Sequence, residues 1–277
     1  MTGDPRTLLA RADLADEQLE GLVRAGRFAA PQQMRCIRPS AGILKAPEAG
    51  SEWRDEMLFG EGFAVLEAGD GWAWGQAQRD GYVGFVATEA LAPAGEAPTH
   101  RVQALRTAAF ARPDLKSEVL ALLSMNSLVR AGETCGDYVH ADDGGWIFAA
   151  HLAPVGVFET DFVAVAERYL GAPYVWGGRS SLGLDCSGLV QAGMHAVGRA
   201  CPRDTDQQLA ALSEAPDRSS LVRGDLVFWK GHMGVMLDAE RMIHANAHHM
   251  AVAVELLNDA LARIEAAGAP FAGYRRP

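Results

Sequence analysis

The chain has 277 residues, of which 49% are hydrophobic and 22% charged, and its formal net charge is −10. This composition is ordinary for a globular protein with a buried core. The acidic excess argues against binding to nucleic acid or to an anionic membrane, because Lys and Arg hold both. No segment approaches the roughly 18 consecutive apolar residues of a membrane-spanning helix.

Residues 1–33 form the first predicted segment, a helical lead-in. Leucines recur at roughly helical spacing between residues 5 and 27, and this pattern predicts a short helix. Acidic residues interrupt the stretch, whereas a secretion signal needs an uninterrupted apolar core. We therefore expect a cytoplasmic protein. Its four cysteines lie far apart and form no CxxC pair, as expected for reduced thiols without a metal: Cys36, Cys135, Cys186 and Cys201.

Residues 34–95 and 96–156 are predicted to form two small β-barrels. Short apolar runs there alternate with Gly, Pro and Asp turns. The segment VLEAGDGWAWGQAQRDGYVGFVATEALAP (65–93) shares an ordered set of features with LVRAGETCGDYVHADDGGWIFAAHLAP (128–154), including the final L-A-P. Duplication explains this ordered match; independent convergence on the same turn chemistry is the alternative.

Residues 157–277 have a different pattern. DFVAVAERYLG, from residue 161, predicts a helix that ends at Gly171. A glycine-rich loop follows, and CSGLVQAGMHAVG, from residue 186, predicts a second helix. The remaining short apolar runs read as strands, so this part is expected to be an α+β catalytic unit.

Cys186 stands where the glycine-rich loop meets the second predicted helix. A thiol at a helix N-terminus is expected to have a lowered pKa, because the helix dipole stabilises the thiolate. Asp185 opposes that shift but suits the N-cap position. His232 and His244 follow in GDLVFWKGHMGVML and RMIHAN, and strand–turn–strand connectivity would bring their imidazoles side by side. This combination predicts a thiol nucleophile (Cys186), its base (His232) and an orienting residue (His244).

Four ordered strings in residues 169–245 resemble the NlpC family of papain-like bacterial cell-wall peptidases: YLGAPYVWGGRSSLGLDCSGLVQ, CPRDTDQQ, RGDLVFWKGHMGVML and MIHA. The preceding residues are similar to paired bacterial SH3-like domains, including an LFGE string at 58–61. The resemblance implies an α+β protein: a papain-like NlpC catalytic domain over 157–277, preceded by two SH3-like barrels and a short N-terminal helix. It assigns Cys186, His232 and His244 the same three roles.

The resemblance also implies a substrate. Similar enzymes are cytoplasmic γ-D-glutamyl-L-diamino-acid endopeptidases, of the dipeptidyl-peptidase VI type, that recycle murein peptides with a free N-terminal L-Ala. Such an ammonium group needs carboxylates, and Glu61 and Asp204 are the candidates, although each could equally be a solvated turn residue. Tyr174 could line the cleft or pack in the core. The second repeat lacks the GYVGF string of the first, so only the first barrel is expected to contact substrate. The candidate substrate-binding residues are Glu61, Tyr82, Tyr174, Asp185, Ser187, Asp204 and Thr205.

Neither a metal nor a cofactor is expected, since the sequence contains no HExxH motif, serine elbow, phosphate loop or dinucleotide fingerprint. Two rival functions are a secreted hydrolase of intact peptidoglycan and a catalytically idle peptide-binding protein. The oligomeric state, the diamino acid and the permitted substrate length are left open.

Overall fold

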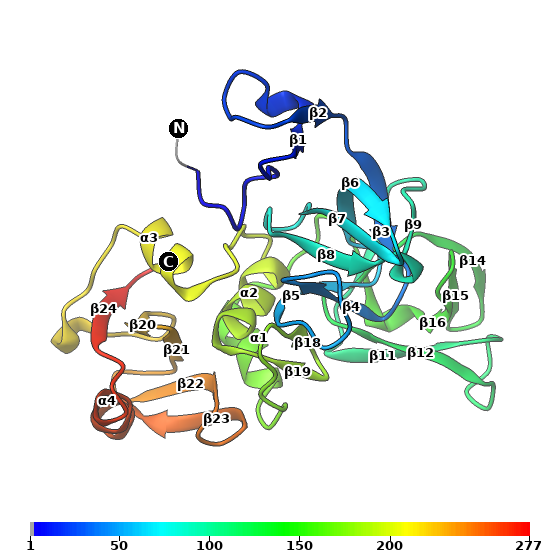
Figure 1. The fold of residues 1–277 in the computed structure, drawn as a ribbon. Helices are drawn as coiled ribbons and strands as arrows, with labels where there is room; N and C mark the ends of the chain where they lie inside the picture. The colour runs from blue at the N-terminus through cyan, green and yellow to red at the C-terminus, as the bar shows by residue number, and fades with distance from the viewer. Residues whose placement is uncertain (1–2) are drawn as a thin grey trace. The chain divides into compact units, whose positions relative to one another are not determined.

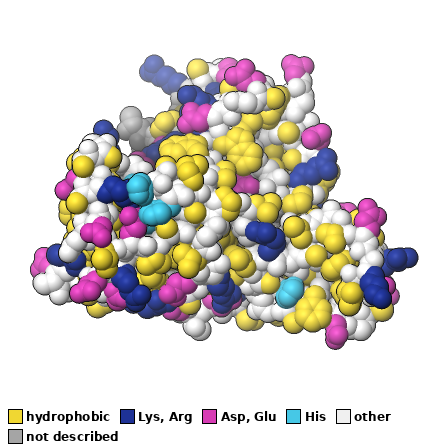
Figure 2. All heavy atoms as spheres, turned by 90° about the horizontal axis from the view of Figure 1, so that it is seen from below, with side chains coloured by type: hydrophobic (Ala, Val, Ile, Leu, Met, Phe, Trp, Pro, Cys, Tyr) yellow, Lys and Arg dark blue, Asp and Glu magenta, His cyan; other side chains and the backbone are white. Residues whose placement is uncertain are grey.

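The computed structural model describes residues 3–277. The chain divides into two compact units, Met1–Val155 and Gly156–Pro277. Figure 1 shows that the first is built almost entirely of strands, whereas the second combines helices with a sheet. Within the described residues, every helix is too short or too polar to cross a lipid bilayer. On the face seen in Figure 2, Lys and Arg side chains lie among Asp and Glu.

The first β-region of the first unit is a seven-stranded sheet with the order β5-β4-β8-β7-β6-β3-β9. Its buried core includes Ile43, Met57 and Phe63. The β6–β7 turn contains Asp70 and Gly71 at positive φ, which is the backbone that a tight hairpin requires. The strands are β3 (Gln32–Cys36), β4 (Ser40–Leu44), β5 (Trp53–Leu58), β6 (Gly62–Gly69), β7 (Trp72–Ala77), β8 (Val83–Ala87) and β9 (Leu91–Pro93).

The second β-region contains a three-stranded sheet, β13-β10-β17, and a five-stranded sheet, β12-β11-β16-β15-β14. Each L-A-P end of the sequence repeat is a three-residue strand after a 3-10 turn: Thr88–Ala90 before β9, and Ala149–His151 before β17. The two repeats therefore end in the same local structure. The strands are β10 (His100–Val102), β11 (Arg106–Phe110), β12 (Val119–Ser124), β13 (Leu128–Val129), β14 (Ala131–Cys135), β15 (Tyr138–Ala141), β16 (Gly145–Phe148) and β17 (Leu152–Pro154).

The helix predicted between residues 5 and 27 is wrong. The described part of this segment contains β1 (Leu14–Asp16), a 3-10 turn (Glu17–Leu19) and β2 (Arg27–Ala29), and the two strands pair in parallel. Leu9 and Leu14 belong to a core cluster with Leu66, Trp74 and Val83 of the β-region, whereas Leu22 is 51% exposed. Contacts of single leucines with the β-region replace the continuous apolar stripe that a helix would need.

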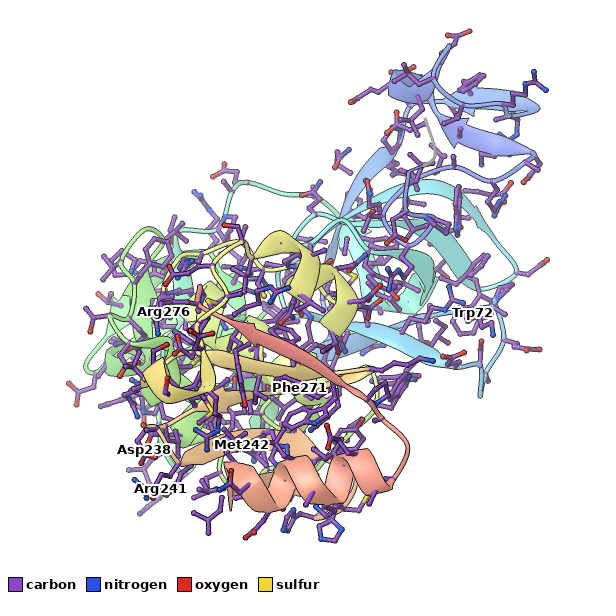
Figure 3. The ribbon with its side chains drawn as sticks, turned by 90° about the vertical axis from the view of Figure 1, so that its left-hand side faces the viewer. Trp72, Asp238, Arg241, Met242, Phe271 and Arg276 are labelled. Atoms are coloured by element: carbon purple, nitrogen blue, oxygen red, sulfur yellow. The ribbon has the colours of Figure 1, made fainter. Side chains whose placement is uncertain are left out.

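The second unit has a five-stranded antiparallel sheet with the order β23-β22-β21-β20-β24. Helix α2 contacts β21 and β22. Helix α4 shares a core cluster with Trp229, Met236 and Met242, and Figure 3 shows α4 beside the strand that carries Met242. The elements are α1 (Phe162–Arg168), β18 (Arg179–Ser180), β19 (Gly183–Leu184), α2 (Cys186–Ala196), α3 (Thr205–Ala211), β20 (Leu226–Trp229), β21 (His232–Met236), β22 (Arg241–Asn246), β23 (Ala251–Leu256), α4 (Leu257–Ala266) and β24 (Phe271–Arg275).

Candidate active site

The loop before Cys186 is packed tightly against helix α2, and glycine is needed for this. A Cβ atom on Gly178 would lie 2.5 Å from the carbonyl oxygen of Gly183, and one on Gly188 would lie 2.3 Å from that of Gly178. These distances are too short for any side chain. The glycines of the sequence motif therefore allow the β18–β19 hairpin to set Cys186 at the first residue of α2.

Asp185 caps α2 and is part of a buried ion pair. Its carboxylate accepts hydrogen bonds from the Gly177 and Gly188 N–H groups at 2.9 and 2.8 Å, and from both terminal nitrogens of Arg203 at 2.9 and 2.6 Å. Burial opposes ionisation, but the Arg203 charge and these hydrogen bonds outweigh it and hold the pKa of Asp185 below its usual range. Ser187 donates to Asp185 at 3.1 Å and accepts from Arg203 at 2.8 Å. Asp185 and Ser187, which were both predicted to contact substrate, are thus hydrogen-bonded to each other and to Arg203.

The thiol of Cys186 is buried, with 6% of the residue exposed. Burial and the charge of Asp185 raise its pKa to about 11, against hydrogen bonds from the Met233 N–H and the Thr205 hydroxyl and the positive charge of Arg203. The prediction that the helix dipole lowers the pKa of Cys186 is therefore wrong, because removal of the thiolate from water has the larger effect. In the resting site Cys186 is a neutral thiol at pH 7.

His232 and His244 are hydrogen-bonded to each other, with 2.8 Å between His232 Nε2 and His244 Nδ1. Their side-by-side placement on β21 and β22 agrees with the prediction. A Cβ atom on Gly234 would lie 2.3 Å from the Met242 methyl group and 3.3 Å from His244 Cβ, so glycine keeps the space between the two strands open. The Trp229 ring lies 5.7 Å from that of His232, with 33° between their planes. Burial, together with the charges of His244 and Arg263, lowers the pKa of His232 to about 3, so this imidazole is neutral at pH 7.

The sequence interpretation missed Glu255. Its Oε2 lies 2.6 Å from His244 Nε2, and Arg263 of α4 forms an ion pair with the same carboxylate at 2.5 Å. Glu255 lies in the strand VAVEL, two residues after Ala253, so both side chains are on the same face of the sheet. Ala253 is the residue opposite His244 on the neighbouring strand. This shared face is the signal that could have identified it, but only with the strand register in hand.

The other predicted residues fall into two groups. In the second unit, Tyr174 is half-buried and close enough for the charges of Cys186 and Asp185 to add to burial in raising its pKa. Asp204 is the N-cap of α3, and its N–H donates to Gln207 Oε1 at 3.2 Å. Thr205 follows it, and its hydroxyl is close enough to Cys186 to act against the rise in the pKa of the thiol.

Glu61 and Tyr82 belong to the first unit. Glu61 is 2% exposed; it accepts from the Leu58 N–H at 3.0 Å and pairs with Arg79 at 3.0 Å. Tyr82 is buried, and its N–H donates to Asp80 at 3.1 Å.

Among residues 3–277, one group offers three donor atoms within 4.8 Å of one another: His244, His249 and Glu255. Two of its members are already joined by a hydrogen bond, and the guanidinium of Arg263 on Glu255 repels a cation. We therefore assign no metal there.

The neutral thiol leads to a pH prediction. Alkylation of Cys186 by iodoacetamide should accelerate about tenfold per pH unit between about pH 7 and pH 10, because the thiolate fraction of a group with a pKa of about 11 grows in that proportion. Peptide mass spectrometry in a Cys135→Ala background, which removes the exposed thiol, would measure this rate. A fast rate that is already constant at pH 7 would instead show a thiolate–imidazolium pair and contradict the prediction.

A thiol at the start of a buried helix, with two hydrogen-bonded imidazoles on the strands that this helix contacts, defines a papain-like thiol hydrolase fold. Residues 171–264 match the NlpC/P60 family, and residues 43–91 match the bacterial dipeptidyl-peptidase Sh3 domain. The chain therefore contains a domain of the NlpC/P60 family of cysteine peptidases, together with a bacterial SH3 domain.

Part of this chain is similar to curated proteins. It is 34% identical over 93 residues to gamma-D-glutamyl-L-lysine dipeptidyl-peptidase of Bacillus subtilis, a match that covers 31% of each chain. It is 31% identical over 111 residues to dipeptidyl-peptidase 6 of Lysinibacillus sphaericus, covering 40% of this chain and 41% of the relative. The chain thus spans less than half the length of the curated relatives it matches.

A solved structure extends the similarity of fold to most of the chain. An NlpC/P60 family protein from Bacillus cereus superposes with a TM-score of 0.75 at 18% identity, covering 88% of this chain and 99% of the other. A second, an NlpC/P60 endopeptidase from Photobacterium damselae, has a TM-score of 0.60 at 14% identity and covers 88% and 70%. The α+β fold, with SH3-like β-regions before a papain-like domain, is therefore confirmed.

Proposed function

We propose that this protein is a cysteine endopeptidase that hydrolyses the bond between γ-D-Glu and an L-diamino acid in short murein peptides with a free N-terminal L-Ala. The observation that carries the proposal is the hydrogen-bonded pair His232–His244 beside the Cys186 helix. The name of the relative at 34% identity, gamma-D-glutamyl-L-lysine dipeptidyl-peptidase, supports the choice of bond.

The reaction begins with a neutral thiol and a neutral imidazole. Cys186 Sγ attacks the γ-carbonyl carbon while His232 accepts the thiol proton. The N–H of Cys186, at the start of α2, has no acceptor within the helix and is available to the developing oxyanion. His232 then protonates the leaving α-amine, and the C–N bond breaks to leave a thioester. Water attacks this thioester with His232 again accepting a proton, and the C–S bond breaks to restore the thiol.

Substrate length is set by recognition of the free amine. In this proposal Glu61 and Asp204 are the carboxylates that recognise the ammonium group, and the other candidate substrate-binding residues are Tyr82, Tyr174, Asp185, Ser187 and Thr205. Glu61 is suited to this role because it is a buried carboxylate whose position is fixed by Arg79 and by the Leu58 N–H. An N-acetylated or sugar-linked peptide lacks the positive charge that these carboxylates would recognise, and it adds bulk at the same end.

The function predicts strong discrimination between free and capped substrates. L-Ala-γ-D-Glu-meso-diaminopimelate should be cut with a kcat/KM at least about 100-fold higher than that of its N-acetyl analogue. A site built to bind a polar group discriminates strongly against an analogue that lacks this group. Glu61→Gln should reduce this ratio by lowering kcat/KM for the free amine. Glu89→Gln, the same change at an exposed position of the first unit, is the matched control. Equal kcat/KM for both peptides in the wild-type protein would favour a hydrolase of intact peptidoglycan.

The compartment forms part of the proposal. Among the described residues all four cysteines are free thiols, which suits a reducing cytoplasm. A cytoplasmic endopeptidase of this specificity would act on peptides already released from the wall, in peptidoglycan recycling.

A further inference from the structure

We propose that Glu255, held by Arg263, is a positioning residue that determines which nitrogen of His232 carries the proton. This inference rests on the proposed function of the Cys186 site, and it extends the predicted three-residue array by a fourth side chain, Glu255, with Arg263 as its ion-pair partner. Neither residue was part of the sequence interpretation.

The strand register brings Glu255 to the back of the histidine pair. On β22 and β23, His244 lies opposite Ala253 and Met242 lies opposite Glu255, so the Glu255 side chain is the diagonal neighbour of His244 on the same face. Its side chain is 13% exposed. Helix α4 starts directly after β23, and Figure 1 shows it alongside β22 and β23. Arg263 of this helix contacts both carboxylate oxygens, at 3.3 and 2.5 Å.

The hydrogen bonds then fix one proton arrangement. An ionised carboxylate only accepts, so His244 must donate from Nε2 to Glu255. In a neutral imidazole the other nitrogen is an acceptor, so His244 Nδ1 receives the proton of His232 Nε2. His232 Nδ1 is therefore left without a proton. It is the nitrogen that can take the proton of Cys186.

The charges around Glu255 keep it in the accepting form. The hydrogen bond from His244 has the largest effect on the pKa of Glu255. Together with the hydrogen bond and charge of Arg263, it outweighs partial burial and lowers this pKa to about 2. The groups facing this carboxylate are His244 on β22, Arg263 on α4 and His249 in the β22–β23 loop. Its negative charge also favours the imidazolium that forms on His232 during attack.

A carboxamide at this position would remove the constraint. The side chain of Glu255→Gln either accepts from His244 Nε2, as before, or donates to it. In the second case His244 donates from Nδ1 and His232 must carry its proton on Nδ1, where it is no longer a base for Cys186. Arg263→Met keeps the carboxylate and hence the original arrangement. Glu265→Gln, on the exposed face of α4, is the matched control.

The test combines a spectroscopic and a kinetic measurement. Long-range 1H–15N correlation spectra at neutral pH should show His232 and His244 both protonated on Nε2 in the wild type, in Arg263→Met and in Glu265→Gln. Glu255→Gln should add signals from the reversed pattern and lower kcat about 10- to 100-fold, with KM changed by less than about twofold, since the substrate is not contacted.

The outcomes separate this inference from the proposed function. A wild-type His232 protonated on Nδ1 would overturn the inference without any variant. A folded Glu255→Gln protein with the wild-type proton pattern and kcat would also overturn it, while leaving the peptidase function intact. If the wild type does not cleave the murein peptide, the proposed function fails, and the spectra of wild type and variants still decide the proton arrangement.

Discussion

Cys186→Ala should lower kcat/KM for the murein tripeptide by at least about 10⁴-fold, because removal of a nucleophile eliminates the covalent route and leaves only binding and oxyanion contacts. The fold should persist, since alanine is a good helix former and Cys186 is the first residue of α2. Hydrolysis assays with thermal unfolding as a check on folding would measure both effects.

The other cysteines provide matched controls for this substitution. Cys135 is exposed and Cys36 and Cys201 are buried. Burial raises the pKa of the Cys36 thiol to about 12, so Cys36 is an unreactive core residue. Alanine at any of the three should leave kcat/KM within about threefold of wild type, because surface and small core changes act mainly on stability. Near-normal hydrolysis by Cys186→Ala would remove the basis of the proposed mechanism.

His232→Ala should be nearly as damaging as loss of the thiol, with a fall in kcat of at least about 10³-fold, because a neutral thiol with a pKa of about 11 needs a base in order to attack. His244→Asn or His244→Gln should retain more activity, about 10- to 100-fold below wild type, since an amide oxygen can still accept from His232 Nε2. Steady-state kinetics on purified, folded variants would rank them. A larger loss at His244 than at His232 would show that the roles of base and orienter are exchanged.

Local sequence chemistry predicted the elements whose structure depends on neighbours in the chain. The two L-A-P segments have the same 3-10 turn and strand, and α1 begins at Phe162, directly after its N-cap Asp161, whose side chain accepts from the Val163 N–H. Turn and cap residues act over a few positions, so their pattern is visible in the sequence. The N-terminal leucines were misread because their spacing does not say that Leu9 and Leu14 join the core of another segment.

The same distinction applies to the site. The strand–turn–strand pattern predicted that His232 and His244 would lie side by side, and they share a 2.8 Å hydrogen bond. Glu255 was missed because its contact with His244 depends on the β22–β23 register. The direction of the Cys186 pKa was wrong because a helix dipole is a property of local sequence, whereas burial beside Asp185 results from the whole fold.

The measurement that tests the central claim most directly is the product spectrum of one peptide. L-Ala-γ-D-Glu-meso-diaminopimelate, and its L-Lys counterpart, would be incubated with wild type and with Cys186→Ala, and the products identified by mass spectrometry. We predict that wild type releases the dipeptide L-Ala-D-Glu and the free diamino acid from at least one of the two peptides, and that Cys186→Ala releases neither. Release of L-Ala alone, or the same two products from both proteins, would contradict a thiol peptidase specific for the γ-D-glutamyl bond.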